Sequence, residues 1–131
     1  MGLAEKRLAK HIQDNVLPGF MEKIKSIAGF EPTLEINWDT FTAYDEYPLS
    51  RLEGDILPSL IEVFQSICRD DIGREALQSA LKTIRLENTD DDNTVEVRFA
   101  DGVLYHRMQL AGGTYSRYSA DNIIALLEKA L

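Results

Sequence analysis

The chain has 131 residues, 44% hydrophobic and 27% charged, which are values typical of a globular protein and enough for a single domain. Its 22 acidic and 14 basic residues give a formal net charge of −8, a field that disfavours nucleic acids and anionic membranes as partners. Apolar runs are far shorter than the roughly 20 residues of a membrane span, and no secretion signal is recognised, so we expect a cytoplasmic protein.

A long amphipathic helix is expected over residues 3–28. Apolar residues recur every three to five positions between Leu3 and Ile27, the spacing of a helix with one face toward a core. Pro18 removes a backbone donor within this stretch, but the apolar stripe keeps its phase, which predicts a kink and not a break. Gly29 and Pro32 end the helix.

A half-exposed strand is predicted next, because Leu34, Ile36 and Trp38 alternate with polar residues. Residues 39–48 have no clear period and are expected to form a loop, with continuation of the strand as the alternative. Ser50 and Glu53 match a capping box, so a second proline-bearing helix is predicted from there to about residue 69. Residues 17–27 and 57–67 resemble each other, which either an internal duplication or convergence of two kinked helices explains.

The second half of the chain predicts a third helix capped by Asp70 or Asp71, a short strand around residues 84–86 and an acidic loop at 88–93. Alternation over residues 95–110 around Asp101-Gly102 predicts a β-hairpin in which Phe99 faces Leu104. Ser119 is expected to cap a final helix.

These elements follow the order α-β-α-α-β-β-β-α. The order predicts an α+β fold, with a mostly antiparallel sheet of about four strands and helices packed on one face.

No residue pattern predicts catalysis, a cofactor or a metal site. Cys68 lies on an apolar helix face, and His106 lies on the apolar face of the hairpin, where a buried, hydrogen-bonded histidine is expected. The acidic run from Asn88 to Glu96 resembles the start of a calcium loop, but Asn93 and Phe99 occupy the positions that need glycine and a bidentate carboxylate. A solvated loop is the simpler interpretation.

Two short stretches combine aromatic and charged residues, as protein-binding surfaces often do. The first runs from Trp38 to Tyr47 and the second from Thr114 to Tyr118 before the last helix. Packing of Trp38 and Phe41 in the core is the alternative for part of the first stretch. The residues predicted to bind a partner are Trp38, Tyr44, Asp45, Glu46, Tyr47, Tyr115, Arg117 and Tyr118.

The leading hypothesis is therefore a non-catalytic protein-binding module, similar in physical class to an inhibitor, immunity protein or adaptor. It would present an acidic, aromatic surface to a basic protein partner. A second hypothesis is a small-ligand or enzymatic site between the sheet and the kinked helices, lined by Trp38, His106 and Tyr115. A third is a homodimer that buries the apolar stripes of the two long helices.

Overall fold

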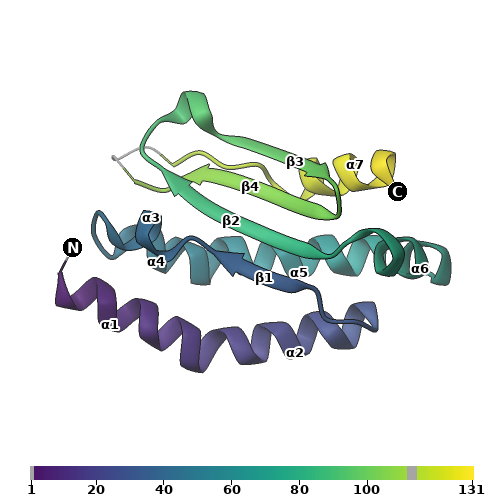
Figure 1. Ribbon diagram of the computed structural model, residues 1–131, viewed down its shortest axis with the longest axis horizontal. Helices are drawn as coiled ribbons and strands as arrows, with labels where there is room; N and C mark the ends of the chain where they lie inside the picture. Colours follow the sequence, from purple (N-terminus) through teal and green to yellow (C-terminus); the bar gives the residue numbers. More distant parts are fainter. Residues whose placement is uncertain (1, 112–114) are drawn as a thin grey trace.

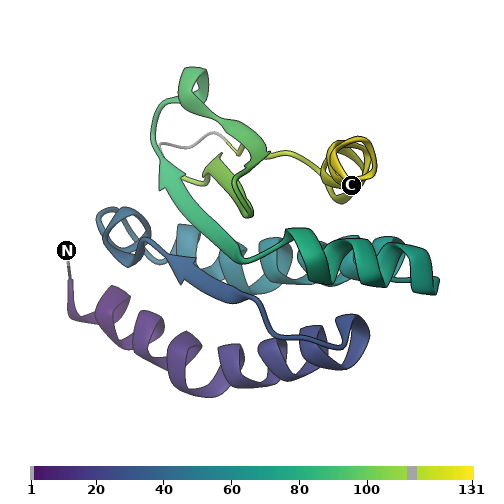
Figure 2. The same ribbon diagram turned by 45° about the vertical axis from the view of Figure 1, so that its right-hand side comes forward.

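A computed structural model of the chain describes residues 2–111 and 115–131, and these form an α+β fold (Figure 1). The sheet has four strands in the order β1-β2-β4-β3, namely Thr33–Ile36 (β1), Thr83–Thr89 (β2), Val103–Gln109 (β4) and Glu96–Ala100 (β3). The helices pack on one face of this sheet (Figure 1, Figure 2). The predicted fold class and the number of strands are confirmed.

The sheet is mixed, and the prediction of a mostly antiparallel sheet is wrong in this detail. β1 pairs with β2 and β2 with β4 in parallel, and only β3 and β4 are antiparallel. The mixed pairing follows from the connections between the strands. The helices between β1 and β2 return the chain to the same end of the sheet, and β4 rather than β3 inserts beside β2. The hairpin therefore places its first strand at the sheet edge.

The first long helix is α-helical at Leu3–His11 (α1) and Leu17–Ala28 (α2), with a π-helical segment at Ile12–Val16 between them. The helix continues past Pro18 as predicted, and the π segment stands where the proline removes a hydrogen bond and crowds the preceding turn. Gly29 ends α2 in the left-handed conformation, with φ of 78°.

The second long helix begins earlier than predicted. Tyr47–Arg51 (α4) already forms its first turn, followed by a π-helical segment at Leu52–Ile56 and by Leu57–Ile67 (α5). Ser50 is not a cap, because its backbone N–H donates to Glu46 O at 2.9 Å inside the helix. Pro48 explains the earlier start, since proline is favoured in the first helical turn.

The two long helices share their irregularity. In each, a five-residue π segment comes directly before a Leu-Pro step, at Leu17-Pro18 and at Leu57-Pro58. The first helix leads directly to β1, whereas a further helix, Asp71–Ala80 (α6), lies between the second and the parallel strand β2. The likeness seen at an offset of 40 in the sequence thus extends to helix geometry, for which the shared proline position gives a physical cause.

The predicted strand 34–38 is too long, because Trp38 begins a short helix, Trp38–Thr42 (α3), and is not in β1. The N–H of Asn37 still donates to Leu86 O at 3.0 Å, as the sheet pattern requires. The carbonyl of Asn37 then accepts from the N–H of Thr40 at 3.1 Å and from its hydroxyl at 2.6 Å. These two bonds turn the chain out of the sheet. Part of the predicted loop is therefore helical.

The remaining helices and the hairpin follow the sequence closely, whereas β2 is longer than the predicted strand and includes Asn88 and Thr89 of the expected acidic loop. Asp70 caps Asp71–Ala80 (α6), accepting from the N–H of Gly73 at 2.8 Å. In the hairpin Phe99 pairs with Leu104 as predicted, and Asp101 and Gly102 both have positive φ, 55° and 80°, as a type I′ turn requires. Ser119 caps Ala120–Ala130 (α7) in a capping box with Asn122.

The core lies between the sheet and the helices, with α5 in the middle because it contacts both α2 and α7. Fully buried residues such as Leu60 and Phe64 of α5 belong to one cluster with Ile84 and Leu86 of β2. No helix in the described residues is both long enough and apolar enough to cross a bilayer.

The opposite face of the sheet is not covered by helices and carries alternating charges. Glu35 of β1 accepts from Arg85 of β2 at 2.8 Å, and Tyr105 of β4 lies under the guanidinium of Arg98 at 4.2 Å. These groups satisfy one another across neighbouring strands, so we regard this face as a solvated surface.

Candidate binding surface

The predicted aromatic segment divides between the core and the surface. Phe41 is fully buried in α3, and Trp38 is half-buried against the core. Tyr44 and Tyr47, by contrast, are 41% and 49% exposed and are among the few exposed large hydrophobic side chains of the described residues. The exposed aromatic surface of this segment therefore comes from the two tyrosines.

Carboxylates surround these tyrosines. Asp45 accepts from the backbone N–H of Tyr47 at 2.9 Å, which fixes the turn that enters α4, and Glu46 is exposed beside it. Partial burial, and then the charge and hydrogen bonding of Asp90, raise the pKa of Tyr44. This contact between Tyr44 and Asp90 shows that the acidic loop after β2 lies next to the segment between α3 and α4.

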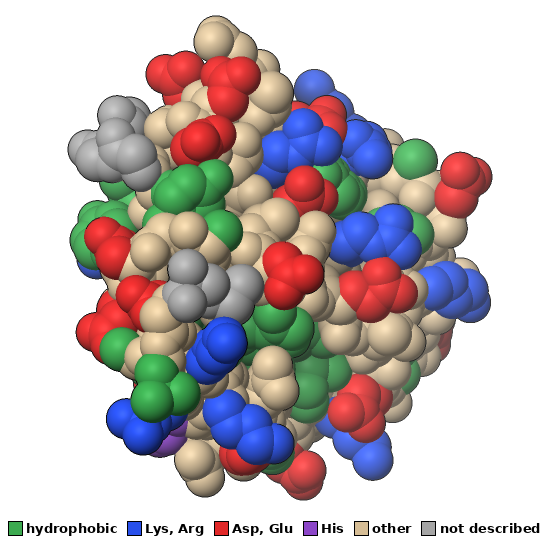
Figure 3. Space-filling view, turned by 60° about the vertical axis from the view of Figure 1, so that its left-hand side comes forward, with side chains coloured by type: hydrophobic (Ala, Val, Ile, Leu, Met, Phe, Trp, Pro, Cys, Tyr) green, Lys and Arg blue, Asp and Glu red, His purple; other side chains and the backbone are tan. Residues whose placement is uncertain are grey.

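We call this surface the acidic aromatic end, defined by Tyr44, Asp45, Glu46, Tyr47, Asp90, Asp91 and Asp92. Figure 3 looks onto this end of the molecule, and acidic side chains lie over its upper and left part with hydrophobic side chains beside them. None of its five carboxylates forms an ion pair with another described residue. Ion pairs among the described residues thus do not neutralise the negative charge of this surface.

Arg51 joins the two predicted aromatic stretches. Its guanidinium lies 4.6 Å from the ring centre of Tyr115 and 5.9 Å from that of Tyr47. Such cation–π contacts hold aromatic rings in place, each worth about 0.5–2 kcal/mol depending on burial. Tyr47 therefore has an ordered neighbour on the helix side as well as Asp45 on the turn side. Thr114, the first residue of the second stretch, lies outside the described residues.

Arg117 fixes the second stretch to the helix. Its Nε and Nη2 donate to the two oxygens of Asp55 at 2.7 and 3.1 Å, a bidentate pair. The same Nε also donates to the hydroxyl of Tyr115 at 2.9 Å. Because Asp55 and Arg117 are both mostly buried, this pair holds the segment before α7 against the π segment of the second helix.

His106 is a buried core histidine, as the hairpin pattern predicted. It is 3% exposed, and its Nε2 accepts from the backbone N–H of Tyr118 at 3.2 Å. Burial, followed by the charge of Arg117, lowers its pKa from 6.5 to about 4. The ring is therefore neutral at neutral pH and helps to anchor Tyr118, whose own ring meets it edge-on at 6.0 Å.

Arg51 and Asp55 are the residues that sequence reasoning missed. They follow Tyr47 at intervals of four residues, which places all three on one face of the second helix. That spacing could have indicated a shared helix face in the sequence, but only if the helix is known to begin at Tyr47. Because the helix was predicted to begin at Ser50, Tyr47 was assigned to a loop and the spacing had no meaning.

We also considered two other kinds of site, a reactive cysteine and a metal centre. Cys68 is 5% exposed, and burial raises the pKa of its thiol, which opposes formation of a reactive thiolate. Among residues 2–111 and 115–131, no three His, Cys, Asp or Glu side chains lie close enough together to hold a metal ion.

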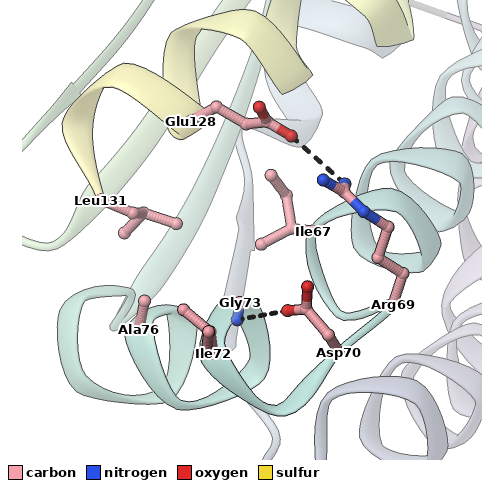
Figure 4. A pocket seen from close by; sticks show the side chains of 8 residues that line it. All are labelled: Ile67, Arg69, Asp70, Ile72, Gly73, Ala76, Glu128 and Leu131. Atoms are coloured by element: carbon pink, nitrogen blue, oxygen red, sulfur yellow. Dashed lines mark hydrogen bonds and ion pairs between the residues drawn. The ribbon is translucent and has the colours of Figure 1, made fainter.

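A second exposed apolar patch lies between α6 and α7, around a hollow of about 220 Å³. Figure 4 shows Ile72, which is 82% exposed, and Leu131 on two sides of this hollow. The polar groups at its rim already have partners, since Arg69 lies 3.3 Å from Glu128 and Asp70 accepts from Gly73. This patch therefore offers apolar contact without free charge.

Comparisons with known proteins identify no relative of this chain. The chain matches no protein-family model, no curated protein and no solved structure at a significant level.

Proposed function

We propose that this protein is a binding module whose acidic aromatic end holds a basic segment of a protein partner. The observation that carries the proposal is the exposure of Tyr44 and Tyr47, at 41% and 49%, among carboxylates that have no ion-pair partner within the described chain. Tyrosine contributes contact area at low entropic cost, and unpaired carboxylates select and attract positive charge.

The ordering of the surface supports the proposal. Tyr47 is fixed by the Asp45 turn and by Arg51, and Arg51 is in turn packed on Tyr115. A surface that is already ordered loses little conformational entropy on binding, so more of the contact energy appears as affinity. Exposed aromatic side chains on a mobile segment would not have this advantage.

The small-ligand hypothesis has less support. It requires a polar site around His106, yet that ring is almost fully buried and its Nε2 already accepts a hydrogen bond from the Tyr118 backbone. Tyr115 is likewise engaged by both Arg51 and Arg117. The polar groups proposed for a ligand site thus serve the packing of the segment before α7.

The test is capture of partners from the native lysate on immobilised chain, with Tyr44→Ala/Tyr47→Ala as the variant. Its matched control is Ile72→Ala, which removes an exposed hydrophobic side chain from the patch between α6 and α7. We expect a basic protein, or a protein with a basic segment, to bind the native chain and the control and to be lost from the tyrosine variant. The interaction should also weaken as salt increases.

Two outcomes would contradict the proposal. One is the absence of any specifically captured protein. The other is a captured protein that the tyrosine variant retains and the Ile72→Ala variant loses, which would move the binding surface to the patch between α6 and α7.

A further inference from the structure

The charge of the chain is divided unevenly between its first helix and the rest. Residues 2–28 hold five Lys or Arg against three Asp or Glu, whereas residues 29–131 hold nine against 19. The first long helix is therefore net positive by two charges and the remainder net negative by ten. The chain thus carries, in one molecule, a basic helix of the kind that its own acidic aromatic end would attract.

The outer face of α1 concentrates this positive charge. Leu3, Lys6, Arg7 and Lys10 are all exposed and are spaced by three and four residues, which places them on one stripe. Leu3 is 60% exposed. Lys6 and Arg7 form no ion pair with any described residue, and Lys10 pairs only with Asp14, at 3.3 Å on the same helix. We call these four residues the basic stripe.

The basic stripe and the acidic aromatic end lie at the same end of the molecule. α1 contacts both α3 and α4, the helices that flank Tyr44 to Tyr47. In Figure 3 several basic side chains lie in the lower left part of this end, with acidic side chains above them and others among them. This end of the molecule therefore presents both signs of charge close together, with Leu3 and the two tyrosines exposed among them.

We propose that the partner held by the acidic aromatic end is a second copy of this chain, which contributes its basic stripe. This inference rests on the proposed function. A two-fold axis through the shared face would set the basic stripe of each copy against the acidic aromatic end of the other. Leu3 would meet the tyrosines, and Lys6 and Arg7 would meet unpaired carboxylates.

The charge balance favours a second copy placed in this way. Two chains of net charge −8 repel each other in most orientations, so a stable contact needs local attraction that offsets this repulsion. A face carrying both signs provides it, because every favourable contact occurs twice in a two-fold dimer. A contact between the acidic regions alone would add to the repulsion.

The first test is sedimentation velocity on the purified full chain over a range of micromolar concentrations. We expect a monomer–dimer equilibrium for the native chain. Lys6→Glu/Arg7→Glu should raise the dimer Kd by about tenfold or more, because the two reversals act at both symmetric contacts. The matched control is Lys23→Glu/Lys25→Glu, which changes net charge equally on α2 and should leave the dimer largely intact.

The second test is a charge swap. Glu46 and Asp92 have side chains that form no hydrogen bond or ion pair with other described residues, so Glu46→Lys/Asp92→Lys should leave the fold unchanged. This variant alone should be monomeric. Mixed with Lys6→Glu/Arg7→Glu, it should form a heterodimer, since each contact then again joins opposite charges. Circular dichroism on each variant checks that it is folded.

The outcomes separate this inference from the proposed function. A native chain that stays monomeric while the tyrosine-dependent capture returns a different protein would overturn the dimer and leave the binding function standing. A monomer that captures nothing would overturn both. A dimer that the Lys6→Glu/Arg7→Glu variant retains would show that the contact does not use the basic stripe, and a dimer that the α2 control abolishes would place the contact on α2. Either result would overturn the inference.

Discussion

His106 shows what a single buried residue contributes. Its pKa is lowered from 6.5 to about 4, first by burial and then by Arg117, so the folded state holds it neutral. A histidine with a lowered pKa binds a proton more readily when unfolded. Its stabilising contribution is therefore complete above about pH 6.5 and is lost progressively as the pH falls toward 4.

This predicts a specific pH dependence. Between pH 7 and pH 4.5 the native chain should lose free energy of unfolding faster than the His106→Gln variant, which has nothing to protonate at this position. Urea denaturation at several pH values measures both. If the free energy of unfolding of the two proteins changes in parallel with pH, the pKa of His106 is the same in the folded and unfolded states, and the prediction is wrong.

The residues of the candidate surface were predictable to different degrees. Tyr44 and Tyr47 stood out by composition alone, because aromatic and acidic residues alternate there. Their neighbours did not, because Asp55 and Arg117 lie 62 residues apart in the chain and meet only through the fold. A pair of this kind leaves no local pattern in a single sequence.

At the level of elements, two serines make a matched comparison. Ser119 accepts from the N–H of Asn122 at the start of α7, whereas Ser50 lies inside the second helix and caps nothing. Ser119→Ala should lower the free energy of unfolding by about 1 kcal/mol, the usual cost of losing such a cap. Ser50→Ala should change it by less than about 0.5 kcal/mol.

Chemical denaturation of both variants measures the difference. Equal losses would show that the Ser119 cap adds little, and a larger loss for Ser50→Ala would indicate that this serine does hold a helix end.

Helices and the hairpin were predictable because each has a local cause. The apolar stripe of residues 3–28 survives Pro18, and Asp101-Gly102 fixes the hairpin register. Boundaries were less predictable where two signals compete. Ser50 and Glu53 match a capping box, but Pro48 starts the helix one turn earlier, and Trp38 fits the alternation of β1 yet begins α3. The position of Pro48 determines where the second long helix begins, and backbone hydrogen bonding to Asn37 determines where β1 ends.

At the level of the whole molecule, strand order could not be derived from the sequence. The helical connection between β1 and β2 and the insertion of β4 beside β2 are long-range choices, and they make the sheet mixed. The acidic aromatic end depends on the same choices, because the loop after β2 reaches Tyr44 only when β2 lies next to β1. Composition indicated an acidic protein, and the fold decides where that acidity gathers.

The most direct test of the binding function is amide hydrogen exchange of the chain, free and bound to the partner that it captures. We predict slower exchange on binding in residues 43–51 and 90–94, which include the acidic aromatic end, and unchanged exchange in residues 69–76 of the patch between α6 and α7. Protection confined to residues 69–76, or absent from residues 43–51, would contradict the account.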